Sequence, residues 1–161
     1  MLTERLFLGG LSKRGLGEFS LSRNRYGVLI ASHASPCEEI GSVSVYIQPW
    51  EITISSQIIH THVGRTDFYP RAHERTLTNL GYKRLIARGA LDKLQSLVSG
   101  RIVLSRTESL TGQTLSSGWG PIETEDRARD LRQLEELHGQ PVVLRQWTWF
   151  GAFPAVAKEW V

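Results

Sequence analysis

The sequence predicts an α+β fold that is rich in β-structure: an antiparallel sandwich or barrel-like sheet with two short helices. Three observations lead to this prediction. Apolar residues alternate with polar residues in several short runs, turn-forming segments separate these runs, and two stretches carry apolar residues at helical spacing. With 161 residues, 40% of them hydrophobic and 22% charged, the chain can bury a core of its own.

The first seventeen residues differ from the rest of the chain. Their apolar run, LFLGGL, lies among charged residues and four glycines. Glycine is conformationally permissive, so we expect an N-terminal arm over residues 1–17 rather than a packed helix. Residues 18–161 are then expected to form a single β-rich domain.

Alternating apolar residues predict strands and hairpins in the middle of the chain. The expected elements are a hairpin over 18–31, strands over 43–47 and 52–54 with a turn at Gln48 and Pro49, a strand within 57–69, a short strand over 82–87, a helix over 89–99 and a strand over 101–106. The next segment, TESLTGQTLSSGWGP, is either a long hairpin with its tip near Gly112 or a surface loop.

The clearest local signals begin at Thr124, the expected N-cap of a helix. Leu131, Leu134 and Leu137 recur at every third position, so we expect them to share one face of this helix. Gly139 is expected to end it. The following run, VVLRQWTWF, is rich in β-branched and aromatic residues and predicts a strand.

The same succession of helix, glycine and strand occurs forty residues upstream. There, Leu91, Leu94 and Leu97 precede Gly100 and the apolar run IVL. Two explanations are open: a duplicated structural unit, and the general tendency of short helices to end in glycine before a strand. The second is preferred, because repeat arrays need three or more copies to bury their faces.

Composition argues against several classes of protein. No apolar run approaches the length of a membrane span, and MLTERLFLGGLSKRGLG is too short and too charged for a signal peptide. The single cysteine, Cys37, permits no intrachain disulfide and could serve as a small buried hydrophobic residue. We therefore expect the chain to remain in a cytoplasm.

The formal net charge of +3 is small, but the charges are unevenly distributed. Residues 60–106 contain nine Lys or Arg and three Asp or Glu, whereas residues 107–139 contain three and seven. Such asymmetry suits head-to-tail association of identical subunits, although solvated surface charge explains it equally well.

A group of histidines is the sharpest candidate for chemistry. His60 and His62 lie two residues apart on an expected strand, so they project from one face and could supply two ligands to Zn²⁺ or another transition metal. His73 or Asp67 would have to provide a third ligand. Because no HExxH or similar spacing is present, ordinary strand histidines are preferred, and no metal or other cofactor is expected.

The sequence contains no G-x-S-x-G, no P-loop and no G-x-G-x-x-G after a strand, so we expect no enzymatic activity. Trp147 and Trp149 alternate on the expected final strand, with Phe150 and Phe153 close behind. Aromatic side chains on a strand can stack bases, but Arg145 is their single basic neighbour in sequence. We therefore favour a core or a subunit interface.

The run LRQLEELHGQPVVLRQWTWFGAF resembles segments of small bacteriophage tail and baseplate proteins, in which a short helix leads through a glycine to an apolar strand of a β-rich domain. The resemblance covers this part of the chain alone. It implies a non-enzymatic structural subunit of a phage tail, a baseplate or a related injection particle. Such a subunit would be located in the virion, and in the host cytoplasm during assembly.

We therefore expect a repeated subunit whose partners are other copies of itself and neighbouring assembly proteins. The expected contact residues are Leu6, Phe7, Leu8, Leu11, Trp147, Trp149 and Phe153. Three alternatives are open: a viral matrix or nucleic-acid-binding protein that uses the basic segment, a small metal-dependent enzyme that uses the histidines, and a soluble adaptor of a host cell.

Overall fold

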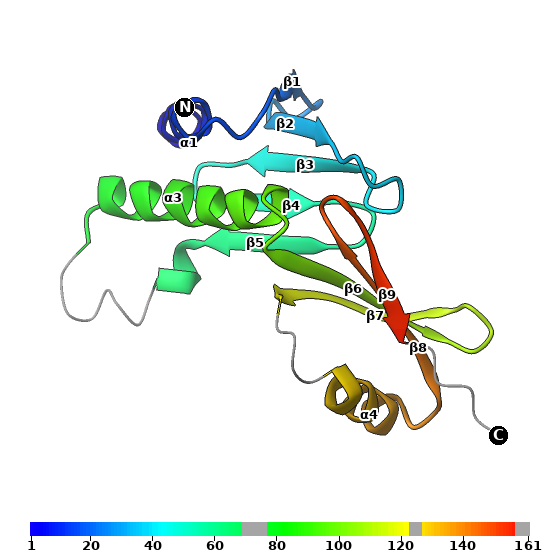
Figure 1. Ribbon diagram of the computed structural model, residues 1–161. Helices are drawn as coiled ribbons and strands as arrows, with labels where there is room; N and C mark the ends of the chain where they lie inside the picture. Colours follow the sequence, from blue (N-terminus) through cyan, green and yellow to red (C-terminus); the bar gives the residue numbers. More distant parts are fainter. Residues whose placement is uncertain (69–76, 123–126, 157–161) are drawn as a thin grey trace.

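The computed structural model describes residues 1–68, 77–122 and 127–156, and it has an α+β fold with two antiparallel sheets, which confirms the predicted fold class (Figure 1). The elements, in chain order, are α1 (Leu2–Arg14), β1 (Ser20–Arg23), β2 (Leu29–Ala34), β3 (Ser42–Ile47), β4 (Glu51–Ser55), β5 (His60–Gly64), the 3₁₀ helix η1 (Arg65–Phe68), α3 (Asn79–Val98), β6 (Ile102–Ser109), β7 (Thr114–Pro121), α4 (Arg127–His138), β8 (Val142–Thr148) and β9 (Gly151–Val156). Strands β1 to β5 form the first sheet and β6 to β9 the second. Within the described residues, no helix has the length and apolar character needed to cross a membrane.

The first sheet is a meander in which each strand pairs with the next strand of the chain. Its register places Ala31, Val45 and Ile54 side by side on one face, where all three are completely buried. Side chains alternate along a strand, so the neighbouring row on the opposite face is polar and includes the bonded hydroxyls of Ser32 and Ser44. The first sheet therefore has one apolar and one polar face.

Helix α3 covers the apolar face of the first sheet (Figure 1). Its buried residues recur at helical spacing from the first turn onward; they are Tyr82, Ile86, Ala87, Ala90, Leu91, Leu94 and Leu97. The prediction of a strand over 82–87 and a helix limited to 89–99 is therefore wrong. Residues 82–87 continue the apolar stripe of one long helix, and packing of that stripe on the sheet stabilises the helix.

Residues 2–14 form helix α1, so the expectation of an arm in place of a packed helix is wrong for this segment. Phe7 is completely buried, and Leu11 is buried in the same core as α3 and the first sheet. Gly10 lies against Leu91 of α3, where a side chain would collide, so this glycine allows the two helices to approach closely. Tertiary packing thus outweighs the low helix propensity of glycine.

The second sheet has the strand order β7-β6-β8-β9 and carries α4 on one face (Figure 1). Leu131 of α4 packs with Val142 and Leu144 of β8 in a small cluster. The opposite face joins the main core through Leu104 and Trp147, which are cross-strand partners in β6 and β8. The second sheet therefore projects from a core shared with the first sheet, with the β6–β7 hairpin turn at its far end (Figure 1).

Several local predictions are confirmed. The hairpin expected over 18–31 consists of β1 and β2, and the turn between β3 and β4 contains Gln48 and Pro49, as expected. The segment that could have been a hairpin or a surface loop is the β6–β7 hairpin, with Gly112 in its turn.

The two helix, glycine and strand units also share their geometry. Gly100 and Gly139 both adopt positive φ, at 68° and 63°, and the strands that follow them are antiparallel neighbours. This arrangement fits either explanation of the repeated pattern, so the general tendency of short helices to end in glycine before a strand stays the preferred one.

Helix α4 departs from the predicted apolar face. Leu131 is buried and Leu134 is partly buried, but Leu137 is 74% exposed. A step of three residues is less than one full turn, so successive leucines at this spacing rotate around the helix. The prediction of one shared face is therefore wrong at Leu137, and the expected N-cap, Thr124, lies outside the described residues.

Candidate functional site

Three large apolar side chains are exposed on the second sheet and its helix. Leu110 in the β6–β7 turn is 63% exposed, Leu137 near the end of α4 is 74% exposed, and Phe150 in the β8–β9 turn is 67% exposed. These are the highest values for any Leu or Phe in the part of the chain that the structure describes. We call the three residues the apolar rim, because each lies in a turn or near the end of an element of the second sheet and its helix; Phe150 lies beside Gly100, at the end of the sheet opposite to Leu110.

The predicted contact residues occupy different positions from the rim. Four of them are buried in the chain's own core: Phe7, Leu11, Trp147 and Trp149. Leu6 and Leu8 are partly buried against the same core. Phe153 pairs through its backbone with Gln146, and its side chain lies outside the described residues. A buried side chain is already packed within its own chain, so a contact surface has to be sought mainly among other residues.

Trp149 is held by a stack of rings that joins the two halves of the fold. The His33 ring lies between those of Phe19 and Trp149, with centroid distances of 4.9 and 5.5 Å. Nδ1 of His33 is 2.8 Å from the backbone carbonyl oxygen of Glu18, which fixes the orientation of the imidazole. The aromatic strand thus contributes to the core, which is one of the two roles considered for it.

The histidines of β5 lie on the polar face of the first sheet. The rings of His60 and His62 are 4.6 Å apart, which agrees with the expected shared face, and Nδ1 of His62 is 2.8 Å from Oε1 of Glu51. His73 lies outside the described residues, and Asp67 accepts a backbone N–H instead of approaching the histidines. Within the described ranges, no three His, Cys, Asp or Glu side chains are grouped so that they could hold a metal ion.

The second sheet contains a buried carboxylate, Glu108, that the sequence did not predict. Nε of Arg145 donates to Oε2 of Glu108 at 2.8 Å, and Nε of Arg106 forms an ion pair with Oε1 at 2.7 Å. Burial by itself would raise the pKa of Glu108, but the hydrogen bond from Arg145 and the two positive charges outweigh burial and lower this pKa below its ordinary value. The spacing of Arg106 and Glu108 places both side chains on one face of a strand, which can be read from the sequence. The pairing of β6 with β8, which brings Arg145 to Glu108, cannot be read from it.

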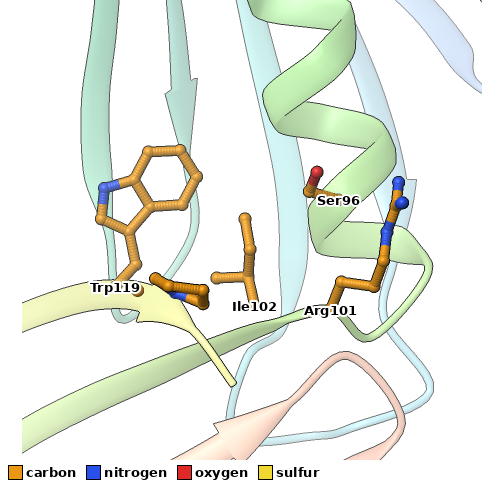
Figure 2. A pocket seen from close by; sticks show the side chains of 6 residues that line it. Ser96, Arg101, Ile102 and Trp119 are labelled. Carbon is orange, nitrogen blue, oxygen red and sulfur yellow. The ribbon is translucent and has the colours of Figure 1, made fainter. Parts of the chain in front are cut away.

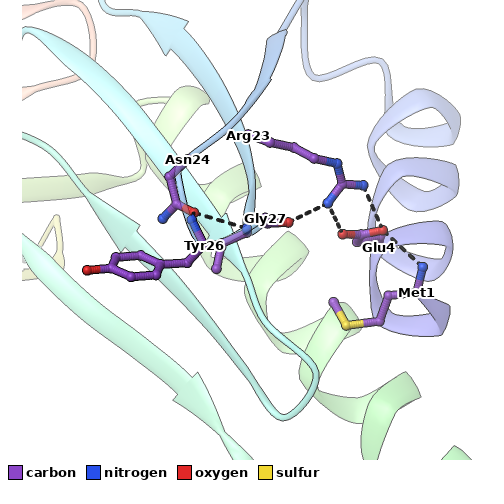
Figure 3. Close-up of polar contacts among 7 residues, drawn as sticks. Met1, Glu4, Arg23, Asn24, Tyr26 and Gly27 are labelled. Carbon is purple, nitrogen blue, oxygen red and sulfur yellow. Dashed lines mark hydrogen bonds and ion pairs between the residues drawn. The ribbon is translucent and has the colours of Figure 1, made fainter.

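A second carboxylate connects α1 to the β1–β2 hairpin. Figure 3 shows the guanidinium of Arg23 and the amino group of Met1 converging on Glu4. Arg23 donates to Oε1 and Oε2 of Glu4 at 2.8 and 3.2 Å, and it also donates to the carbonyl oxygen of Gly27 at 2.7 Å. The hydrogen bond from Arg23 is the main reason that the pKa of Glu4 is lowered. This network fixes the start of α1 on the first sheet.

The single cysteine is buried, as one interpretation of the sequence had it. Burial raises the pKa of the Cys37 thiol, and the hydrogen bond that Sγ donates to Glu39 at 3.2 Å raises it further. A raised pKa disfavours the thiolate that nucleophilic chemistry needs.

A pocket of about 450 Å³ lies between the C-terminal end of α3 and the beginning of the second sheet (Figure 2). Its lining residues are Ser96, Arg101, Ile102, Trp119, Gly120 and Pro121. Ser96 and Arg101 lie on one side of Ile102 and the indole of Trp119 lies on the other (Figure 2). These six residues include no acid or base to activate the serine, so we assign no chemical step to the pocket.

No protein-family model matches the sequence, and no curated protein or solved structure matches it. The class of protein is therefore inferred from the fold and from the apolar rim.

Proposed function

We propose that the chain is a non-enzymatic structural subunit of a protein assembly, of the class that includes phage tails and baseplates. The observation that carries the proposal is the apolar rim, Leu110, Leu137 and Phe150, on a sheet that projects from the main core. Burial of one such side chain contributes on the order of 1.5–3 kcal/mol. A contact with another chain would bury these side chains and gain this free energy.

The segment that carries the resemblance to phage tail proteins also supports the proposal. It forms α4, the Gly139 turn and β8, which is the expected order of helix, glycine and apolar strand. Leu137 of the rim lies within this segment, so the resemblance and the exposed surface coincide.

The proposed partners are other copies of this chain and neighbouring proteins of the assembly. The contact residues differ from those predicted from the sequence, because Phe7, Leu11, Trp147 and Trp149 are buried within their own chain. The rim residues replace them. The virion, and the host cytoplasm during assembly, remain the proposed locations.

The proposal is tested by the mass of the full chain in solution. Light scattering over a range of concentrations should detect association of the wild-type chain. The double variant Leu110→Ser and Leu137→Ser should dissociate at a concentration at least about tenfold higher, because each leucine contributes roughly 1.5–3 kcal/mol when buried at a contact. Its thermal unfolding should be nearly unchanged, since both side chains are exposed in the single chain.

Leu21→Ser is the matched control. Leu21 is 54% exposed, but it lies on β1 of the first sheet, whereas the two substituted leucines lie in the β6–β7 turn and on α4. The control should associate like the wild type. A wild-type chain that stays monomeric at every accessible concentration contradicts the proposal, and so does a control that weakens association as much as the double variant does.

A further inference from the structure

Two aromatic rings and two cations meet where the β3–β4 turn, η1 and the first turns of α3 come together. The guanidinium carbon of Arg65 lies 4.4 Å from the ring centroid of Tyr82 and 5.9 Å from that of Trp50. Nζ of Lys83 lies 4.7 Å from the ring centroid of Trp50. We call Trp50, Arg65, Tyr82 and Lys83 the basic aromatic cluster.

Among the described residues, no carboxylate pairs with the cations of this cluster. In the described part of the chain, neither Arg65 nor Lys83 forms an ion pair with a carboxylate. The closest acidic residues in sequence have other partners, since Asp67 accepts the backbone N–H of Gly64 and Glu51 lies 2.8 Å from His62. Within the described residues, Arg65 is therefore an exposed cation and Lys83 a partly exposed one, and neither has an ion-pair partner.

The rest of α3 extends the positive field. The helix contains four Lys or Arg and a single acidic residue, Asp92. Oδ1 of Asp92 lies 2.7 Å from Nη1 of Arg14, and Oδ2 lies 3.9 Å from Nε of Arg88. The single acidic side chain of the helix is therefore shared between two cations. An anionic chain that followed the helix would meet further positive charge.

We propose that the basic aromatic cluster binds single-stranded nucleic acid. Tyr82 is buried and supports one side of the Arg65 guanidinium, so the charged plane is held in place. Trp50 is 40% exposed, and its indole is a surface on which an unpaired base can stack. Arg65 and Lys83 lie over the indole ring, so a base that stacks on the uncovered part of the ring brings its flanking phosphates close to both cations.

The chemistry of the cluster favours an unpaired strand over other anionic partners. A duplex hides the faces of its bases, so the exposed indole would contribute nothing to duplex binding. An anionic membrane would call for several apolar side chains inserted together, whereas Trp50 is accompanied by cations. Stacking together with phosphate contact accounts for both components of the cluster.

The test measures binding of a fluorescent oligodeoxythymidylate by anisotropy, with the full chain and at several salt concentrations. Binding should weaken as salt rises, because phosphate contacts release counterions. The double variant Arg65→Gln and Lys83→Gln should lower the slope of log affinity against log salt by about 1.4, which is 0.7 for each lost contact to a single strand. Trp50→Ala should weaken binding by roughly fivefold or more at constant salt while keeping the slope.

Arg25→Gln is the matched control, because Arg25 also lies 4.7 Å from an aromatic ring, that of Tyr26, but on the β1–β2 turn. It should change the affinity by less than about twofold. Circular dichroism and thermal unfolding confirm that each variant is folded. No binding at low salt, equal losses in Arg25→Gln and in the double variant Arg65→Gln and Lys83→Gln, or tighter binding to duplex DNA or to vesicles of anionic lipid would each overturn the proposal.

Discussion

Glu108 illustrates how one buried carboxylate can connect neighbouring strands. It lies on β6, bonds to Arg145 of β8 across the ladder, and pairs with Arg106 two residues before it on its own strand. A buried ionised carboxylate without partners would destabilise the fold. In the folded state Arg145 and Arg106 supply these partners and stabilise the ionised form of Glu108. The pKa of Glu108 is lowered for this reason.

The stability that Glu108 contributes should depend on pH. Its folded-state pKa lies below its unfolded value near 4.3, so the contribution is present above about pH 4.3 and is lost as the pH falls through the lower folded value. We expect Glu108→Gln to lower the free energy of unfolding by about 1–3 kcal/mol at pH 7, and by clearly less at about pH 3. Urea unfolding at the two pH values measures both differences.

Glu136→Gln provides the comparison, because Glu136 is exposed on α4. It should leave the free energy of unfolding within about 0.5 kcal/mol of the wild type. If the effect of Glu108→Gln is the same at both pH values, the ion pairs are not its cause.

The positions of some single residues could be predicted from the sequence, and those of others could not. The shared face of His60 and His62 follows from the two-residue period of a strand, which is a local rule. The contact between Glu108 and Arg145 joins residues 37 positions apart, and no local pattern specifies that separation. Exposure of Leu110 likewise depends on where a hairpin turn ends relative to the rest of the fold.

Helix α1 contains two adjacent glycines with opposite surroundings. A Cβ atom added at Gly9 would meet nothing within 4 Å, whereas one added at Gly10 would collide with the side chain of Leu91. Leu91 is buried, so it can turn aside only by disturbing the core between α1 and α3.

These surroundings predict opposite effects of the same substitution. Gly9→Ala should raise the free energy of unfolding by about 0.5–1 kcal/mol, because alanine favours the helix and restricts the unfolded chain. Gly10→Ala should lower it by roughly 1–3 kcal/mol through overpacking. Denaturant unfolding of the two variants separates the effects, and equal changes would mean that the crossing of α1 and α3 is less close than described.

Elements with a clear local period were predicted well from the sequence. The alternation in β3 and β4 places Val45 and Ile54 on the core face without any knowledge of the fold. Helix α1 was missed because its stability comes from burial of Phe7 against distant residues and not from its own composition. The exposed Leu137 was misjudged because a spacing of three describes a helical face only approximately.

At the scale of the molecule, one core unites the two sheets with α1 and α3. Phe7 and Leu16 near the N-terminus belong to the same buried cluster as Leu104 and Trp147 of the second sheet. The N-terminal segment is therefore part of the monomer core in this arrangement.

Deletion of residues 1–17 should therefore unfold the chain. Loss of one buried Phe or Leu side chain costs about 2–5 kcal/mol, and this segment contains Phe7, Leu11 and Leu16. The combined loss is comparable to the whole stability of a typical domain, about 5–15 kcal/mol. Circular dichroism and thermal unfolding of the truncated chain measure the outcome. A folded truncated chain would restore the earlier expectation of a separable arm.

During synthesis on the ribosome, helix α1 is made well before α3, the helix on which it packs. Arg14 at the end of α1 bonds to Gln95 of α3, which lies 81 positions later in the chain. At about 5–20 residues per second, α1 is complete roughly 4–16 s before this partner has been made. During that interval the meander of β1 to β5 can pair strand by strand, since each pairs with its neighbour in the chain. The apolar face of α1 has no α3 to cover it, so the nascent chain presents a hydrophobic segment to which a chaperone can bind.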